Sequence, residues 1–217
     1  IKENLHNYQK DLKTIIPEKL VGYGRRRSSL ADIILCVDQS GSMGTSVVYS
    51  AIFGAVLASL PAVTTKVVVF DTSVVDLTEK MTDPVDLLFG VQLGGGTDID
   101  RALAYCQELV RRPADTVFVL ISDLYEGGDY RSMLKRSAAL KTAGVNFITL
   151  LALNDEGAPA YSHEVAKAYA ALDIPSFACT PDKFPDLMAA ALQGSDIDRW
   201  AARNEIVTAA LGVQSNT

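Results

Sequence analysis

Residues 32–44 read DIILCVDQSGSMG, an uninterrupted aliphatic run that becomes polar at Asp38. A continuous apolar run, without alternation of apolar and polar residues, is typical of a parallel strand that is covered on both faces. In open sheets of such strands, ligands bind beyond the carboxyl ends. The stretch therefore predicts a buried strand, Asp32–Val37, whose following loop carries the function.

Similar apolar runs recur along the chain and alternate with helical patterns. Further strands are expected at Lys66–Phe70, Val74–Leu77, Thr116–Ile121, Val145–Leu151 and Ser176–Cys179. Helices are expected at Ser42–Leu60, Ile99–Arg111, Tyr130–Thr142, Ser162–Leu172 and Asp182–Leu192. This alternation predicts an α/β fold, a Rossmann-like, doubly wound sheet with helices on both faces.

One connection departs from this pattern. Only Asp71, Thr72 and Ser73 separate the second and third expected strands. A link this short permits a hairpin but not a crossover between parallel strands. We therefore expect residues 74–77 to form an antiparallel edge strand of a six-stranded, mainly parallel sheet.

The ends of the chain differ from the main domain, which we place at residues 31–194. Residues 1–30 are expected to form an N-terminal helix, with Leu5, Tyr8 and Leu12 at helical spacing, and then a basic linker containing Arg25–Arg27. Residues 195–217 are expected to hold a last amphipathic helix, Asp196–Leu211, and a short tail. Because the sequence begins with Ile rather than Met, we expect a piece of a longer chain.

Composition restricts the class of protein. The chain has 217 residues, 48% of them hydrophobic, and a net charge of −6, as expected for one globular domain that does not bind nucleic acid. No apolar run is long enough to predict a membrane span. Cys36, Cys106 and Cys179 each lie among apolar neighbours, so we expect buried thiols and a reducing, cytoplasmic location.

Three polar segments lie where the predicted sheet would bring them together. Asp38–Gly44 and Ser122–Asp123 follow strands, and Gly94–Asp98, which reads GGGTD, precedes a helix. Together they offer two carboxylates and three hydroxyls, those of Asp38, Asp123, Ser40, Ser42 and Thr97. An all-oxygen set without His or Cys suits a hard divalent cation, Mg²⁺ first and then Mn²⁺ or Ca²⁺. An open coordination position would accept a carboxylate from outside.

This pattern resembles a known family. Asp-x-Ser-x-Ser, a distant Thr after glycines and an Asp after a strand are similar to the metal-ion-dependent adhesion site of von Willebrand factor A (VWA) domains. The positions of that motif are filled by Asp38, Ser40, Ser42, Thr97 and Asp123. The resemblance covers roughly residues 31–194. It implies metal-dependent protein binding rather than catalysis, in which a partner's Asp or Glu completes the coordination of the cation.

A narrower resemblance rests on the segments LCVDQSGSM, GGGTDI and ISDLYEGGD. They are similar to the CoxE-like branch of bacterial VWA proteins, whose members are typically cytoplasmic and work with MoxR-type AAA+ ATPases. The resemblance implies an adaptor for such an ATPase or its client. Leu124-Tyr125-Glu126 departs from the usual pattern, in which a glycine follows the Asp. Glu126 and Asp129 are interpreted as solvated loop charges or as extra acceptors at the rim.

Two other functions fit parts of the sequence. Ser42, Asp123 and His163 have the chain order of a serine hydrolase triad, and Ser40-Gly-Ser-Met-Gly44 is one residue away from a nucleophile elbow. That hypothesis leaves Asp38 and Thr97 without a role. An extracellular adhesion VWA domain is the other alternative, and the odd number of cysteines counts against it.

Overall fold

The computed structural model describes residues 8–9, 14–15, 31–43, 64–80, 94–151, 160–178 and 183–204. Its main sheet contains β3 (Asp32–Asp38), β4 (Thr64–Phe70), β5 (Val74–Asp76), β6 (Thr116–Ser122), β7 (Asn146–Leu151) and β8 (Ser176–Phe177). The α-helices are α3 (Ile99–Leu109), α4 (Tyr130–Thr142), α5 (His163–Ala171), α6 (Phe184–Leu192) and α7 (Ile197–Arg203). Short 3₁₀ turns are η2 (Gly41–Met43), η3 (Thr78–Lys80) and η4 (Pro113–Asp115).

The sheet has six strands in the order β5-β4-β3-β6-β7-β8. All neighbouring strands are parallel except β4 and β5, which pair antiparallel through the short turn at residues 71–73. The predicted fold class and the antiparallel edge strand are therefore confirmed. β3 lies between β4 and β6, so the winding of the sheet reverses at β3, and its carboxyl end is the expected ligand position.

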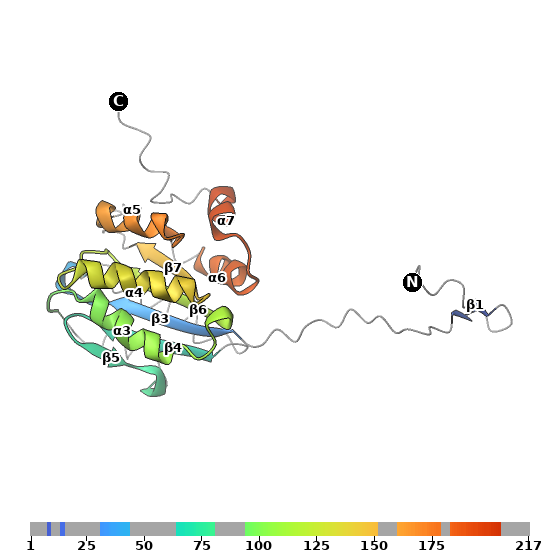
Figure 1. Ribbon diagram of the computed structural model, residues 1–217, viewed down its shortest axis with the longest axis horizontal. Helices are drawn as coiled ribbons and strands as arrows, with labels where there is room; N and C mark the ends of the chain where they lie inside the picture. The colour runs from blue at the N-terminus through green and yellow to red at the C-terminus, as the bar shows by residue number, and fades with distance from the viewer. Residues whose placement is uncertain are drawn as a thin grey trace, which may run out of the picture.

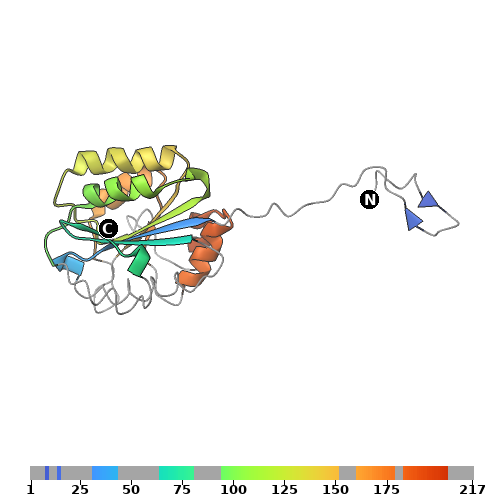
Figure 2. The same cartoon turned by 90° about the horizontal axis from the view of Figure 1, so that it is seen from below.

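Helices cover both faces of this sheet (Figure 1). Seen from below, α3 and α4 lie on one side of the strands, and α6 and α7 lie on the other (Figure 2). Successive residues of β3 face the two layers alternately: Ile33 and Leu35 belong to the apolar cluster that includes α6 and α7, while Ile34 and Cys36 belong to the one that includes α3, α4 and α5. Burial on both faces explains the continuous apolar runs of the sequence.

Side-chain caps fix where several helices begin. The carboxylates of Asp98, Asp129 and Asp196 and the hydroxyl of Ser162 accept hydrogen bonds from backbone N–H groups in the first turns of α3, α4, α7 and α5, respectively. These caps agree with the predicted helix starts near residues 99, 130, 162 and 196. α4 begins after the loop that follows β6, and the backbone N–H of the α3 cap Asp98 donates to Asp71 O at 2.9 Å, so both caps are tied to the carboxyl edge of the sheet.

The N-terminal helix prediction is wrong at the residues that the structure describes there. Tyr8–Gln9 (β1) pairs antiparallel with Thr14–Ile15 (β2). The β-branched Thr14 and Ile15 favour an extended backbone over a helix, and a four-residue connection is sufficient to close a hairpin. The basic linker, most of the helix predicted at Ser42–Leu60 and the end of the last predicted helix lie outside the described residues.

Candidate metal centre

The five predicted metal ligands lie at the carboxyl edge of the sheet and around the start of α3. Asp38 is the last residue of β3, Ser40 and Ser42 follow it, Asp123 directly follows β6, and Thr97 precedes α3 by two residues. Four of these side chains are buried, with exposed fractions of 0% for Asp38, 3% for Ser40 and Asp123, and 9% for Thr97. Ser42 is exposed. The site is thus a largely buried polar cluster that opens to solvent on the side of Ser42.

The first loop brings its three polar side chains together, as the i, i+2, i+4 spacing predicts. Asp38 Oδ1 accepts a hydrogen bond of 2.9 Å from the backbone N–H of Ser40. Ser40 Oγ lies 3.1 Å from Ser42 Oγ. Two hydroxyl oxygens are therefore adjacent, with the carboxylate of Asp38 attached to the same turn.

Ser122, which belongs to the third polar segment but was not among the predicted ligands, joins the first and third loops. Ser122 Oγ donates to Asp38 Oδ2 across 2.7 Å and also accepts a hydrogen bond of 2.9 Å from the backbone N–H of Leu124. Ser122 is the last residue of β6 and is fully buried. Its hydroxyl therefore fixes both the Asp38 carboxylate and the turn that follows Asp123.

The pKa of the Asp38 carboxyl reflects the burial of this side chain and its polar neighbours. Burial raises the pKa of this carboxyl to about 6, against the hydrogen bonds from Ser40 and Ser122, which lower it. The negative charge of Asp123 adds to the rise. The two carboxylates are thus close enough to repel each other, and a cation between them would remove that cost.

The second loop is held by Asp71, another residue that the sequence analysis used only to define the hairpin. Asp71 Oδ2 accepts hydrogen bonds from the backbone N–H groups of Gly94 and Gly95, at 3.4 and 3.2 Å, and Oδ1 accepts one of 2.6 Å from Ser73. Although burial raises the pKa of Asp71, these hydrogen bonds lower it below its usual value overall. The position of Asp71 at the start of the three-residue hairpin link is the signal in the sequence for its contact with Ser73, whereas its contacts with Gly94 and Gly95 join residues 23 and 24 positions away.

Backbone hydrogen bonds connect the second loop to its two neighbours. Gly41 N–H donates to Gly95 O at 3.1 Å, and Gly127 N–H donates to Thr97 O at 3.0 Å. A Cβ placed on Gly127 would lie 2.7 Å from Thr97 O, so only glycine fits this approach. The three loops that carry the predicted ligands are thereby joined into one unit.

Glu126 and Asp129, which we interpreted as solvated loop charges or as extra acceptors at the rim, accept hydrogen bonds from the first turns of two helices. Glu126 Oε2 accepts a hydrogen bond of 2.7 Å from the backbone N–H of Ile99, the first residue of α3. Asp129 Oδ1 accepts one of 3.0 Å from Ser132 in the first turn of α4. Both carboxylates therefore stabilise helix N-termini, where backbone N–H groups lack partners within the helix. Burial raises the pKa of Glu126, against its hydrogen bonds to backbone N–H groups.

The chemistry of the donor set fits a hard divalent cation. Within the described part of the chain, neither Asp38 nor Asp123 forms an ion pair with a Lys, Arg or His. The described part of the chain also contains no group of three or more His, Cys, Asp or Glu side chains that could hold a metal ion. The available ligands are therefore two carboxylates and three hydroxyls, a set with little charge that matches Mg²⁺ better than Zn²⁺.

The hydrolase hypothesis gains no support from the geometry. Ser42 Oγ lies 3.1 Å from Ser40 Oγ, and Asp123 Oδ1 accepts a hydrogen bond of 3.1 Å from the backbone N–H of Tyr125. The ring of His163 lies beside that of Tyr161, with centroids 4.6 Å apart. Among the described residues, no hydrogen bond connects His163 with Ser42 or Asp123, so a triad is not assembled.

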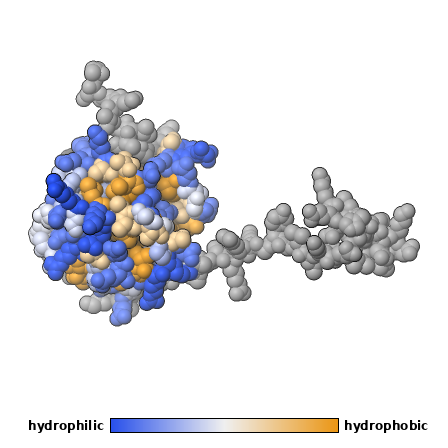
Figure 3. Space-filling model, viewed as in Figure 1, coloured by the Kyte–Doolittle hydropathy of each residue, from blue (hydrophilic) through white to orange (hydrophobic). Residues whose placement is uncertain are grey.

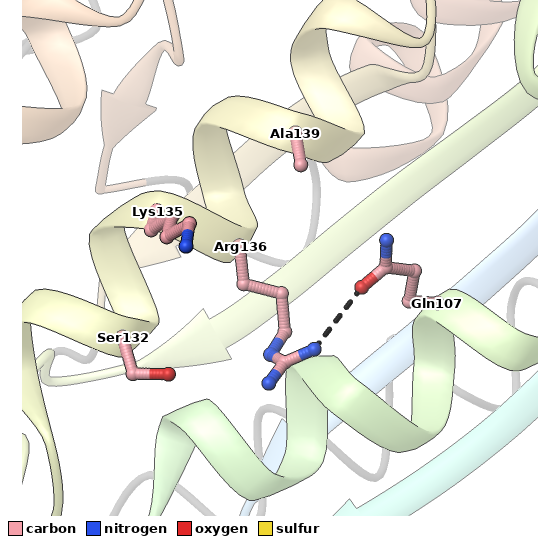
Figure 4. A pocket seen from close by; sticks show the side chains of 5 residues that line it. All are labelled: Gln107, Ser132, Lys135, Arg136 and Ala139. Carbon is pink, nitrogen blue, oxygen red and sulfur yellow. Dashed lines mark hydrogen bonds between the residues drawn. The ribbon is translucent and has the colours of Figure 1, made fainter.

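A separate polar groove lies between α3 and α4 (Figure 4). It has a volume of about 280 Å³ and is lined by Gln107, Ser132, Lys135, Arg136 and Ala139. Arg136 spans it, donating from Nη1 to Gln107 Oε1 at 3.2 Å and from Nε to Asp100 Oδ1 at 3.0 Å. These contacts join the two helices, and none of the five predicted ligands lines the groove.

The fold and the arrangement of the three loops define a VWA-type domain. The chain belongs to the family of VWA domain containing CoxE-like proteins, whose model matches residues 1–188. An uncharacterized protein of Escherichia coli (strain K12), YehP, is 41% identical over 169 residues. That match covers 78% of this chain but 45% of YehP, so the chain spans less than half the length of this relative.

Solved structures show the same fold at low sequence identity. A von Willebrand factor type A structure from Catenulispora acidiphila has a TM-score of 0.58 and 14% identity, and the match covers 76% of this chain and 43% of that one. An aerotolerance-related membrane protein from Bacteroides fragilis, with multiple mutations to serines, has a TM-score of 0.56 and 13% identity. That match covers 78% of this chain and 99% of the other. BatB from Bacteroides thetaiotaomicron has a TM-score of 0.51 and 12% identity, with coverage of 78% and 99%.

VWA domains in general mediate protein–protein interaction and are non-enzymatic. Of the helices that the structure describes, none combines the length and the apolar character needed to cross a bilayer.

Proposed function

We propose that this chain is a metal-dependent protein-binding module. Asp38, Ser40, Ser42, Thr97 and Asp123 would hold one divalent cation, Mg²⁺ before Mn²⁺ or Ca²⁺. The cation supplies a positive charge with an open coordination position for a carboxylate of a partner protein. The chain's own contribution is to hold the five oxygens in place and to surround them with buried, hydrogen-bonded loops.

The observation that carries this proposal is the pair of buried carboxylates. Asp38 and Asp123 are 0% and 3% exposed, and the charge of Asp123 raises the pKa of Asp38 in addition to the larger effect of burial. Buried carboxylates without a cationic partner are costly, and such sites are commonly completed by a metal ion. The two hydroxyls of Ser40 and Ser42, 3.1 Å apart on the open side, are suitable neutral ligands.

A thermal melt in EDTA, Mg²⁺, Mn²⁺ and Ca²⁺ tests the cation site. Asp123→Asn removes one ligand charge, and the new side chain oxygen still accepts from Tyr125 N–H. Asp129→Asn is the matched control, because it removes the same charge from the same loop and Asn also caps helices well. At a hundredfold excess over Kd, Mg²⁺ should stabilise the native state by about 2.7 kcal/mol, a rise in Tm of about 5–10 °C.

The wild type and Asp129→Asn should show this rise, and Asp123→Asn should lose most of it. A rise that persists in Asp123→Asn, or no rise with any of the three cations, would reject the site.

We further propose that the partner is a MoxR-type AAA+ ATPase or its client and that the chain works as a cytoplasmic adaptor. Membership in the CoxE-like family supports this choice of partner. The test is binding of the chain to a MoxR-type ATPase of the same organism, measured by biolayer interferometry in Mg²⁺ and in EDTA. Binding that EDTA and Asp123→Asn both abolish is the expected result; binding that is indifferent to both would contradict a metal-bridged contact.

A further inference from the structure

One exposed aromatic side chain lies beside the candidate metal centre. Among the described residues, Tyr125 is the only large hydrophobic side chain that is clearly exposed, at 55%. It is two residues from Asp123, and its backbone N–H donates to the Asp123 carboxylate at 3.1 Å. Tyr is enriched among the residues that dominate binding at protein interfaces.

Contacts on both sides of Tyr125 fix the backbone at this position. Leu124 is fully buried in the apolar cluster with α3 and α4, and its φ of 62° lies in the left-handed region that a leucine rarely adopts. Glu126, on the other side, is hydrogen-bonded to the start of α3. The strained turn at Leu124 places Leu124 in the core and Tyr125 in solvent, at a cost of about 1–2 kcal/mol.

A second segment with aromatic side chains is hydrogen-bonded to the backbone of Asp123. The backbone N–H of Ser162 donates to the carbonyl oxygen of Asp123 at 2.8 Å. On either side of Ser162, the rings of Tyr161 and His163 lie 4.6 Å apart, and His163 is exposed. Asp123 is therefore connected directly to two segments that carry aromatic side chains.

We propose that Tyr125 contacts a large apolar or aromatic side chain of the partner, next to the partner's metal-binding carboxylate. This rests on the proposed function and narrows it: the partner is a protein segment in which Asp or Glu is within about two residues of a Phe, Trp, Tyr, Leu, Ile or Met. The cation provides the charge-dependent part of recognition. Tyr125 provides the selectivity between one acidic segment and another.

Selection of peptides from a random library tests this composition. The full chain is immobilised in Mg²⁺, a library of displayed 12-residue peptides is passed over it, and bound peptides are eluted with EDTA. The expected pool is enriched in an acidic residue with a large apolar neighbour. Two enriched peptides are then synthesised, and their Kd is measured for the wild type, Tyr125→Phe, Tyr125→Ser and Asp123→Asn.

Tyr125→Ser should weaken these peptides by about tenfold or more, the range of an interface residue that dominates binding, and Tyr125→Phe by less than about threefold. Both Tyr125 variants should keep the Mg²⁺-dependent rise in Tm, because Tyr125 contributes no side-chain ligand. Asp123→Asn should lose both the affinity for these peptides and the Mg²⁺-dependent rise in Tm.

The possible failures are distinguishable. Acidic peptides without an apolar preference, or equal affinity of Tyr125→Ser and the wild type, would overturn the role of Tyr125 and leave the proposed function standing. A Mg²⁺-dependent rise in Tm without any EDTA-eluted peptide would overturn both the carboxylate contact and the role of Tyr125. Loss of the rise in Tm in the wild type would reject the metal site itself.

Discussion

Ser122 donates its hydroxyl proton to Asp38 Oδ2 across 2.7 Å, from the end of β6 to the end of β3. The two residues are 84 positions apart in the chain, and both are fully buried. The same hydroxyl accepts from Leu124 N–H, so it determines where the first and third loops lie relative to each other. The hydrogen bond therefore fixes the Asp38 carboxylate at the edge of the sheet.

Replacing Ser122 by alanine should weaken both the fold and the proposed cation site. Ser122→Ala leaves the buried Asp38 oxygen and Leu124 N–H without this partner, a loss of about 1–3 kcal/mol in the free energy of unfolding. The Kd for Mg²⁺, measured by isothermal titration, should rise severalfold. Ser137→Ala is the matched control, since Ser137 is also a fully buried serine with hydrogen bonds, to Met133 O and Tyr169 OH, but lies within α4. Equal Mg²⁺ affinities in the two variants would contradict the role of Ser122.

The glycines on the second and third loops should tolerate alanine very differently. In Gly127→Ala the new Cβ would lie 2.7 Å from Thr97 O, so the loops must separate, at a cost of about 1–3 kcal/mol. In Gly96→Ala the Cβ meets only Thr72 Cγ2, at an ordinary 3.5 Å. Urea denaturation should show a clear loss of stability for Gly127→Ala and little change for Gly96→Ala. Similar losses in both variants would show that the close approach to Thr97 is unimportant.

The hydrogen bonds of Asp76 on the edge strand should make stability depend on pH. Although burial raises the pKa of Asp76, hydrogen bonds from Thr78 and Tyr105 and the charge of Lys66 lower it overall. Tyr105 OH donates to Asp76 Oδ2 at 2.9 Å. A carboxyl whose pKa falls on folding stabilises the native state above its unfolded pKa of about 3.9, and the contribution disappears as pH falls through the lower, folded value.

Asp76→Asn should accordingly be less stable than the wild type at pH 7. The difference in the free energy of unfolding should shrink as pH drops below about 4. Tyr105→Phe tests the same pair from the other side and should show a loss of about 1 kcal/mol at pH 7. A difference between Asp76→Asn and the wild type that is constant from pH 7 to pH 3 would contradict this account.

The two described cysteines should be inert in the native protein. Cys36 and Cys106 are each 0% exposed, and burial raises the pKa of the Cys36 thiol, with Cys106 adding to the rise. The reactive thiolate of Cys36 is therefore scarce, and both thiols are inaccessible to reagents. In a Cys179→Ser background, labelling by a thiol reagent should proceed only at the rate of unfolding and should accelerate with urea. Complete labelling within seconds under native conditions would contradict the described burial.

The sequence predicts the fold well because its strands are buried on both faces. Runs such as Thr116–Ile121 need no partner to be recognised, and the three-residue link at Asp71 allows only a hairpin. The spacing of Asp38, Ser40 and Ser42 likewise predicts their contact, because all three lie on one short turn.

Long-range contacts explain what the sequence could not predict. Glu126 caps α3 from 27 residues away, so its carboxylate looks like an ordinary loop charge until the chain is folded. Ser122 belongs to the third polar segment of the sequence, but its hydrogen bond to Asp38, 84 residues away, forms only in the folded chain. In the N-terminal segment, the helical spacing of Leu5, Tyr8 and Leu12 predicts a helix, whereas the structure pairs the β-branched Thr14 and Ile15 with Tyr8–Gln9.

The unequal lengths of the strands restrict how this domain can meet another protein. The long strands β3 and β6, of seven residues each, lie inside the sheet, while the edge strands β5 and β8 have three and two residues. Figure 3 shows hydrophilic and hydrophobic residues side by side on one face of the domain. Short edges offer few unpaired backbone groups, so another chain gains little by extending the sheet. Binding of another protein must then depend on side chains of the domain, and a single substitution can change which protein is bound.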